Sequence, residues 1–292
     1  MMSLSAKLSQ LVELLNAKPI NLPFSALEQN ITSIQTDSRK LKPGEIFLAF
    51  RGEKFDGHAF VEGAIAGGAI AGIVDNQYQS SNLPLLQVEN TLKAYQQIGR
   101  WWRDRFNIPV IGVTGSVGKT TTKALISAVL GTQGEVLKTY ATFNNEIGVP
   151  KTCLDLTPQH QYAVIEMAMR GQGQIAELTE IANPDIGVIT NVGTAHIELL
   201  GSEEAIACAK CELLATMPAN SIAILNHDNP LLLTTATKVW HGTTLTFGLE
   251  GGDVQGKLID SDTVEVDQMR FKLPLPGRHN ALNYMSALDR KS

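Results

Sequence analysis

Apolar residues alternate between short runs and helix-like spacing over most of the second part of the chain. The short runs are typical of buried strands, and the segments between them have the period of amphipathic helices. We expect strands at 108–111, 136–140, 162–168, 186–190 and 222–225, and helices near 119–131, 146–156, 173–182 and 202–215. Alternating strands and helices predict an α/β fold with a mostly parallel sheet and helices on both faces. Residues 245–273 add short β-like runs separated by turns.

The N-terminal part has a similar pattern in a shorter form. The expected elements are an amphipathic helix over 1–16, strands within 31–50 and at 70–74, and helices near 60–68 and over 90–106. The last of these helices leads directly into the strand at 108, so it belongs with the segment that follows. We therefore expect a small α/β domain over 1–88 and a second, larger domain over 89–292.

Composition and charge narrow the classes of protein to which the chain can belong. With 292 residues, of which 43% are hydrophobic and 18% charged, the chain suits two soluble globular domains. A net charge of −5 gives no basic field for nucleic acid. The longest apolar stretch, 63–74, is too short for a membrane span, and the N-terminal leucines follow a helix face rather than a secretory signal. We expect a cytoplasmic protein with neither membrane insertion nor a nucleic-acid partner.

The chain has three cysteines, a number that suggests a reducing compartment. Cys208 and Cys211 form a single C-x-x-C pair, whereas a zinc site of this type would need a second pair. A redox pair is one interpretation. Packing of two small thiols on a helix is the better one.

A glycine-rich segment joins the strand expected at 108–111 to the helix expected at 119–131. It reads Gly112-Val113-Thr114-Gly115-Ser116-Val117-Gly118-Lys119-Thr120-Thr121-Thr122. This order of strand, turn, Lys-Thr and helix is typical of a phosphate-binding loop, although the strict pattern has Gly where Val113 stands. Backbone N–H groups and the helix N-terminus would bind phosphate, Lys119 would reach the terminal phosphates, and Thr120 would ligate Mg²⁺. An ordinary turn is the alternative, and Lys-Thr directly after the last glycine argues against it.

Three polar residues stand near expected strand ends, where open α/β sheets bind ligands. Glu166 interrupts an apolar run, and a carboxylate there favours a cation such as Mg²⁺. His196 follows the strand at 186–190 and could ligate metal or orient a phosphate, although a single histidine is more often structural. Lys210 lies in the helix near 202–215, where a surface lysine is the simpler interpretation.

Other polar turns have both a binding and a structural interpretation. The pair Asn144-Asn145 precedes a helix, where amides can hold a sugar or phosphate, or simply cap the helix. Asn280 and Asn283 are one helical turn apart and could read an adenine edge, while capping explains Asn280 equally well. In the first domain, Ser38-Arg39 could bind an anion or form a simple turn.

Taken together, these stretches resemble the Mur ligases of bacterial cell-wall synthesis from about residue 30 to the end. The matching stretches are Thr36-Asp37-Ser38-Arg39, Pro43-Gly44, Phe47, Gly52, Asp56-Gly57-His58, Thr114 to Thr120, Asn144 to Pro150, Glu166-Met167, Gly173-Gln174-Ile175, Pro184-Asp185, Thr190 to Gly193, Ala195-His196, Ala209-Lys210 and Gly277-Arg278-His279-Asn280. Within the family, the pattern is most similar to the type that adds D-alanyl-D-alanine to UDP-N-acetylmuramoyl-tripeptide.

The resemblance implies an ATP-dependent amide ligase with a UDP-substrate domain followed by a P-loop domain. In this family the substrate carboxylate attacks the γ-phosphate, and the amine of the incoming dipeptide then attacks the acyl phosphate. Mg²⁺ ions offset the charge of the phosphates and the carboxylate. By resemblance, Thr120 and Glu166 serve one Mg²⁺, while His196 and a carbamylated Lys210 serve the other, and Lys119 completes the catalytic set.

The resemblance also implies the remaining contacts. For ATP, these are Thr114, Gly115, Ser116, Val117, Gly118, Lys119, Thr120, Thr121, Asn280 and Asn283. For the UDP-substrate, they are Asp37, Ser38, Arg39, Thr142, Asn144, Asn145 and Arg170.

The chain departs from the family pattern at several positions. Ala141-Thr142 stands where Gly-Asn is usual, Ala168 follows Glu-Met in place of Gly, and Cys211 follows the key lysine in place of Gly. Members of the family carry a third, C-terminal domain, which we expect this chain to lack. Three alternatives therefore stay open: a ligase of the type that adds the third amino acid, a non-catalytic chain that only binds ATP and UDP-substrate, and a generic P-loop ATPase. A monomer is expected.

Overall fold

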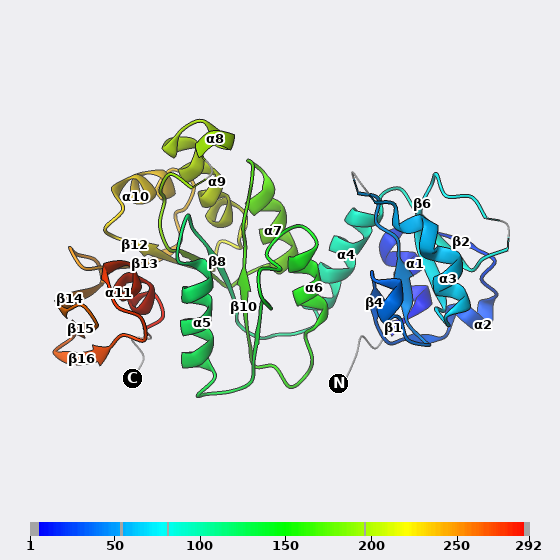
Figure 1. Cartoon of the computed structure of the whole chain (residues 1–292), viewed down its shortest axis with the longest axis horizontal. Helices are drawn as coiled ribbons and strands as arrows, with labels where there is room; N and C mark the ends of the chain where they lie inside the picture. Colours follow the sequence, from blue (N-terminus) through cyan, green and yellow to red (C-terminus); the bar gives the residue numbers. More distant parts are fainter. Residues whose placement is uncertain (1–5, 53–54, 81, 196, 289–292) are drawn as a thin grey trace. The chain divides into compact units, whose positions relative to one another are not determined.

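The computed structural model describes residues 6–52, 55–80, 82–195 and 197–288. It divides the chain into two compact units, residues 1–105 and 106–292, which are described separately (Figure 1). No helix among the described residues has both the length and the apolar character to cross a membrane.

The first unit is built on a five-stranded sheet in the order β2-β7-β6-β5-β4, with a separate ribbon of β1 and β3. Neighbouring strands from β4 to β7 pair in parallel, and β2 pairs antiparallel with β7. Its strands are β1 (Ala6–Lys7), β2 (Lys18–Ile20), β3 (Asn30–Ile31), β4 (Ile34–Gln35), β5 (Ile46–Leu48), β6 (Ala71–Asp75) and β7 (Leu85–Val88). Its helices are α1 (Leu8–Leu15), α2 (Phe24–Leu27), α3 (Val61–Ala66) and α4 (Thr91–Arg103), with 3-10 turns η1 (Ser38–Lys40) and η2 (Gly57–Phe60).

The N-terminal helix is shorter than the one expected over 1–16. In the described residues it begins at Leu8, because Ala6 and Lys7 pair as a strand with Ile31 and Asn30. The backbone N–H of Lys7 donates to the Gln10 side chain at 3.0 Å, which fixes this start.

Helix α4 groups with the first unit, whereas the sequence analysis assigned it to the second domain. It contacts α1 and β6 of the first unit. Its apolar face carries Tyr95, Ile98 and Trp102, all buried, and burial of that face attaches the helix to the first sheet. The structural division therefore falls after Arg105 rather than near residue 88.

The second unit contains a nine-stranded sheet in the order β16-β15-β14-β13-β12-β11-β8-β10-β9. All pairs from β9 to β14 are parallel, and β14, β15 and β16 are antiparallel, so the prediction of a mostly parallel sheet is confirmed. The strands are β8 (Val110–Thr114), β9 (Val136–Lys138), β10 (Tyr162–Glu166), β11 (Ile186–Ile189), β12 (Ile222–Asn226), β13 (Thr243–Gly248), β14 (Val254–Asp260), β15 (Thr263–Val266) and β16 (Met269–Lys272).

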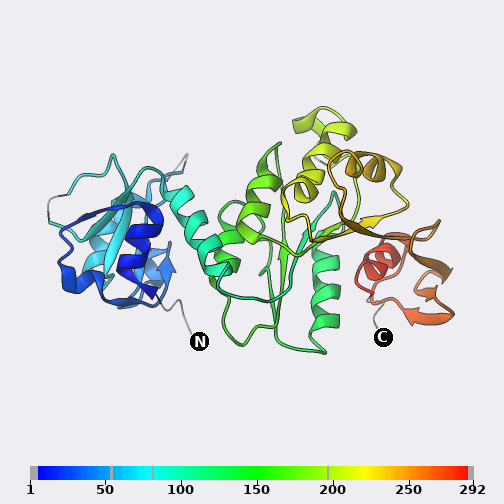
Figure 2. The same ribbon diagram turned by 180° about the vertical axis from the view of Figure 1, so that it is seen from behind.

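Helices cover this sheet on both sides. They are α5 (Lys119–Leu130), α6 (Gly148–Leu154), α7 (Gln174–Ala182), α8 (Ile197–Leu200), α9 (Glu203–Thr216), α10 (Pro230–Ala236) and α11 (Arg278–Met285). Figures 1 and 2 show α5 on one side of β8 and β10, and α6 and α7 on the other. Helix α11 contacts α5, and α9 contacts α7 and α10. The central strand β8 is buried along its length, which explains the apolar residues that precede Thr114 at its end.

Candidate functional site

The glycine-rich loop connects the end of β8 to the start of α5, as the sequence predicts. Gly115 has φ +151° and Gly118 has φ +85°, conformations that residues with a Cβ adopt with strain. A Cβ on Gly115 would lie 1.9 Å from Thr190 Oγ1, and a Cβ on Gly118 would lie 2.3 Å from Asn283 Oδ1. Both glycines are therefore required by backbone conformation and by the close approach of neighbouring side chains.

The turn that follows β11 holds the loop in place. The backbone N–H of Val117 donates to Asn191 Oδ1 at 3.0 Å, and the Thr190 hydroxyl donates to the Val117 carbonyl at 2.6 Å. The Ser116 hydroxyl contacts the backbone of Gly193. These bonds fix the loop against a neighbouring strand end, so its shape does not depend on α5 alone.

Lys119 lies over the loop that precedes it. Its ammonium donates to the Gly115 carbonyl at 2.8 Å and to the Ser116 carbonyl at 3.4 Å. Burial lowers the pKa of Lys119, and the nearby Glu166 opposes that shift. At the base of the loop, the buried Thr114 hydroxyl has no hydrogen-bond partner among the described residues. Thr121 is half-buried in the first turn of α5.

Glu166 ends β10, next to β8, and is only 1% exposed. The Thr120 hydroxyl lies 3.1 Å from each of its carboxylate oxygens, and the Asn144 amide donates to Oε1 at 2.8 Å. The Lys123 ammonium lies 2.9 Å from Oε2. The structure thus brings together Thr120, Glu166 and Asn144, which the sequence singled out, and adds a lysine that it did not.

Lys123 is the residue of this cluster that the sequence analysis missed. It stands one helical turn after Lys119 on α5 and is 4% exposed. Its ammonium also donates to the Ala141 carbonyl at 3.0 Å. Position i+4 from the loop lysine was the available signal, but a lysine in a helix is far more often on the solvent face.

The turn before α6 carries three of the expected substrate contacts, and their roles differ. The Asn144 side chain is committed to Glu166. Asn145 Oδ1 accepts from the backbone N–H of Gly148 at the start of α6, as in helix capping. Thr142 is exposed. Ala141 has φ +47°, a left-handed conformation that suits the glycine usual at this position of the family.

Replacing Ala141 by Gly is expected to raise the free energy of unfolding of the second unit by about 0.5–1 kcal/mol. The substitution removes the Cβ from a left-handed residue and keeps the carbonyl that accepts from Lys123. Urea unfolding followed by hydrogen exchange of β10 measures the change. Ala168→Gly, outside the left-handed region, serves as the control and should not stabilise. A loss of stability in Ala141→Gly would contradict the account.

Lys210 is buried in α9, with 2% of its surface exposed. No described residue forms a hydrogen bond or an ion pair with its ammonium. Burial, with a smaller contribution from Lys119, lowers the pKa of Lys210 to about 7. Next to it, burial raises the pKa of the Cys211 thiol to about 12. Cys208 is exposed, and His196 lies outside the described residues.

Of the two asparagines near the C-terminus, only Asn283 reaches the loop. Asn283 is buried against Gly118, and Ser286 one turn later lies 3.4 Å from the Thr122 hydroxyl. Asn280 is half-buried, and its side chain donates to the Pro276 carbonyl at 2.9 Å. Arg170 is exposed, and its backbone N–H donates to Gln174 Oε1.

In the first unit, Asp37 and Arg39 follow the end of β4. Asp37 accepts from the backbone N–H and from the guanidinium of Arg39, at 2.8 and 2.9 Å for Nε and Nη2. The hydrogen bond from Arg39 lowers the pKa of Asp37 to about 2. Ser38 begins the 3-10 turn between them and is half-buried. An anion bound by Arg39 would therefore meet a guanidinium that is already paired with the Asp37 carboxylate.

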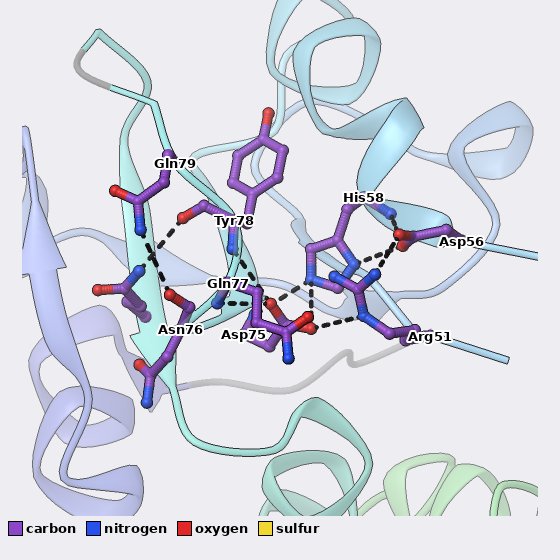
Figure 3. A network of polar contacts seen from close by, with 9 residues as sticks. Arg51, Asp56, His58, Asp75, Asn76, Gln77, Tyr78 and Gln79 are labelled. Carbon is purple, nitrogen blue, oxygen red and sulfur yellow. Dashed lines mark hydrogen bonds and ion pairs between the residues drawn. The ribbon is translucent and has the colours of Figure 1, made fainter.

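A second polar network lies at the ends of β5 and β6 (Figure 3). Arg51 contacts Asp56 at 2.7 Å and Asp75 at 3.0 Å. The buried His58 bridges the same two residues: Nδ1 lies 2.7 Å from Asp56 Oδ1, and Nε2 accepts from the Asp75 backbone N–H at 3.1 Å. We assign the proton to Nδ1, since Nε2 is an acceptor. The network ties the segment after β5 to the segment after β6.

Comparison with protein-family models gives two matches. Residues 113–289 match the Mur ligase middle domain, and residues 30–100 match the Mur ligase family, catalytic domain.

Individual relatives and solved structures agree with these matches. A UDP-N-acetylmuramoyl-tripeptide–D-alanyl-D-alanine ligase from Synechocystis is 58% identical, covering 88% of this chain and 57% of the relative. Its Escherichia coli counterpart is 36% identical, covering 97% and 64%. A crystal structure of MurF from Acinetobacter baumannii superposes with a TM-score of 0.89 at 30% identity, covering 98% of this chain and 64% of that one. The ADP complex of MurF from Thermotoga maritima gives a TM-score of 0.79 at 32% identity, covering 87% and 61%.

The chain thus spans about three fifths of the length of the curated relatives that it matches. The family model of the middle domain alone covers more than half of the chain, and its boundaries enclose the loop, Glu166 and Lys210. The chain belongs to the Mur ligase family.

Proposed function

We propose that this chain carries the substrate- and nucleotide-binding parts of an ATP-dependent ligase that adds D-alanyl-D-alanine to UDP-N-acetylmuramoyl-tripeptide. The observation that carries the proposal is the cluster of Lys119, Thr120 and Glu166 at the mouth of a preformed phosphate-binding loop. The names of the relatives from Synechocystis and Escherichia coli supply the substrates. A cytoplasmic location and a monomeric state belong to the same proposal and rest on the family likeness.

The loop fits the phosphates of ATP. Two glycines keep its backbone close to neighbouring side chains, and the buried Thr114 hydroxyl has no partner among the described residues. The ammonium of Lys119 lies beside the loop carbonyls, from which a rotation of the side chain would bring it to a terminal phosphate. Asn283 packs against Gly118, so it would contribute to nucleotide binding by holding the loop in its shape. The ADP complex of the relative from Thermotoga maritima agrees with this use of the site.

The donor set also fits Mg²⁺. Thr120 and Glu166 offer a hydroxyl and a carboxylate 3.1 Å apart, which are the oxygen donors that Mg²⁺ prefers. By resemblance, His196 and carbamylated Lys210 would hold a second ion. Carbamylation would replace a buried ammonium, which no described residue pairs, by an anionic oxygen ligand. The bound ions would offset the negative charge of the phosphates and of the approaching carboxylate.

Residues of this chain would position the nucleotide and the UDP-substrate for the reaction. The loop and Lys119 orient the γ-phosphate, and the first unit holds the UDP part of the substrate through the segment that contains Asp37, Ser38 and Arg39. The substrate carboxylate then attacks the phosphorus, and ADP leaves. The amine of D-alanyl-D-alanine attacks the resulting acyl phosphate, and phosphate leaves as the amide forms.

The second candidate function is ligation of the third amino acid to a dipeptide substrate. The names of the relatives at 30% identity and above favour the tripeptide substrate. Binding of UDP-N-acetylmuramoyl-dipeptide and -tripeptide, compared by calorimetry, separates the two. Tighter binding of the dipeptide would reverse the choice.

Calorimetry with ADP and Mg²⁺ tests the site itself. Lys119→Ala is expected to weaken ADP binding by at least about a hundredfold, since a charge-assisted contact to phosphate is lost in a partly buried site. Lys238→Ala, an exposed lysine after α10, is the matched control and should leave the affinity unchanged. Equal affinities for the three proteins would remove the basis of the proposal.

A further inference from the structure

Lys123 is buried at the back of the site and is not part of the phosphate-binding loop. Its ammonium contacts two elements at once, Glu166 Oε2 at 2.9 Å and the Ala141 carbonyl at 3.0 Å. The side chain is held between β10 and the turn before α6, and only 4% of the residue is exposed. Its charge is therefore fixed in position beside the carboxylate.

The remaining direct contacts of the Glu166 side chain are with neutral groups. Thr120 offers a hydroxyl, and Asn144 offers an amide N–H. Lys119 acts on Glu166 through space, while its ammonium donates to loop carbonyls. Among the described residues, Lys123 is thus the cation that pairs directly with this carboxylate.

A fixed ammonium changes what Glu166 can bind. A divalent cation on the carboxylate would stand a few ångströms from a like charge that is shielded from water, and the repulsion is strong at that distance. Nucleotide phosphates bring several negative charges to the same place and offset that repulsion. Cation binding at Glu166 should consequently be weak alone and strong together with a nucleotide.

We propose that Lys123 is a positioning residue that makes divalent-cation binding at Glu166 dependent on nucleotide. The ammonium keeps the buried carboxylate paired and aimed toward Thr120, and it disfavours occupation by a free cation. The proposal rests on the proposed function, because it assigns the cation site to Thr120 and Glu166. It explains why a lysine is buried one turn beyond a loop that already has one.

Titration with Mn²⁺, followed by electron paramagnetic resonance without nucleotide, tests the proposal. Lys123→Met should bind Mn²⁺ at least about tenfold more tightly than the unchanged chain, because the competing charge is gone. Lys123→Arg keeps the charge and should behave like the unchanged chain. Lys238→Met is the control for loss of an exposed lysine. With saturating ADP, the unchanged chain and Lys123→Met should both bind Mn²⁺ more tightly than they do without it, because the phosphates add negative charge at the site. Equal or weaker Mn²⁺ binding by Lys123→Met without ADP would overturn the proposal.

A thermal-shift measurement keeps the test decisive if Lys123→Met is unstable. Mg²⁺ alone should raise the melting temperature of Lys123→Met and of Lys123→Gln, while the unchanged chain responds only to Mg²⁺ with ADP. If Lys123 has a purely structural role, its substitution lowers the melting temperature, and Mg²⁺ alone does not raise the melting temperature of either variant. That result would refute the inference. Failure of the unchanged chain to bind Mn²⁺ with ADP would instead refute the proposed function, so the two failures are distinguishable.

Discussion

Replacing Glu166 by Ala should lower the free energy of unfolding of the second unit by about 3–5 kcal/mol. The carboxylate is 1% exposed and lies 2.9 Å from the Lys123 ammonium, which is itself 4% exposed. Removal of the carboxylate leaves a buried cation without a counter-charge, and it also deprives the Thr120 hydroxyl and the Asn144 amide of their acceptor. Hydrogen exchange of the peptide that contains β10, followed by mass spectrometry, reports this loss for the second unit alone.

A double substitution distinguishes the loss of the whole ion pair from the loss of one of its two charges. Glu166→Ala with Lys123→Met removes both charges, so it should be more stable than Glu166→Ala by about 2 kcal/mol. Glu204→Ala, an exposed residue of α9, should change stability by no more than about 0.5 kcal/mol. A cost below about 1 kcal/mol for Glu166→Ala would show that the ion pair does not support the sheet.

Replacing Lys210 by Met should stabilise the second unit by about 2–4 kcal/mol near neutral pH. Met keeps much of the volume and needs no solvation, whereas the buried lysine has its pKa lowered from 10.5 to about 7. Between pH 7 and 10.5 the unfolded lysine binds more protons than the folded one, so the stability of the unchanged chain rises with pH across that window. The advantage of Lys210→Met is therefore greatest below pH 7 and shrinks toward pH 10.

Unfolding of both proteins at pH 6 and pH 9 measures this difference. Lys238→Met is the control, because its lysine is exposed and the substitution should leave the pH dependence unchanged. Lys210→Met should also abolish any carbamate signal in ¹³C NMR after incubation with ¹³C-bicarbonate. A variant that is less stable than the unchanged chain at pH 6 would contradict the cost assigned to the buried ammonium.

A stabilising substitution at Lys210 would mean that the residue is retained for chemistry. Burial of an ammonium is unfavourable, and stability alone would favour an apolar side chain there. The neutral amine is the form that reacts with carbon dioxide, and a pKa of about 7 makes that form abundant near neutral pH.

The glycine-rich loop and the parallel sheet could be predicted because their signals are local. Strand, turn, Lys-Thr and helix follow one another in the sequence, and alternation of apolar runs gives the sheet its type. The side chain that ends β10 was also predictable, since a carboxylate in an apolar run is unusual. These predictions required no knowledge of which strands are neighbours.

The missed features all depend on partners distant in the sequence. The role of Lys123 appears only when β10 and the turn at Ala141 are placed beside α5. The assignment of α4 depended on its contacts with α1, which the order of elements does not reveal. Asn280 and Asn283 are both asparagines of α11, yet of the two only Asn283 lies against the loop. The reason is that one side of α11 packs against α5.

The place of β8 in its sheet has a consequence for how the protein is made. This strand lies between β11 and β10, both of which come later in the chain. A ribosome therefore releases the loop, with Lys119 and Thr120, well before the strands that flank it and before Asn283, which braces Gly118. The loop therefore gains the contacts that shape it only after β10, β11 and Asn283 have been synthesised, and a translation product interrupted before Asn283 would carry the complete loop sequence without them.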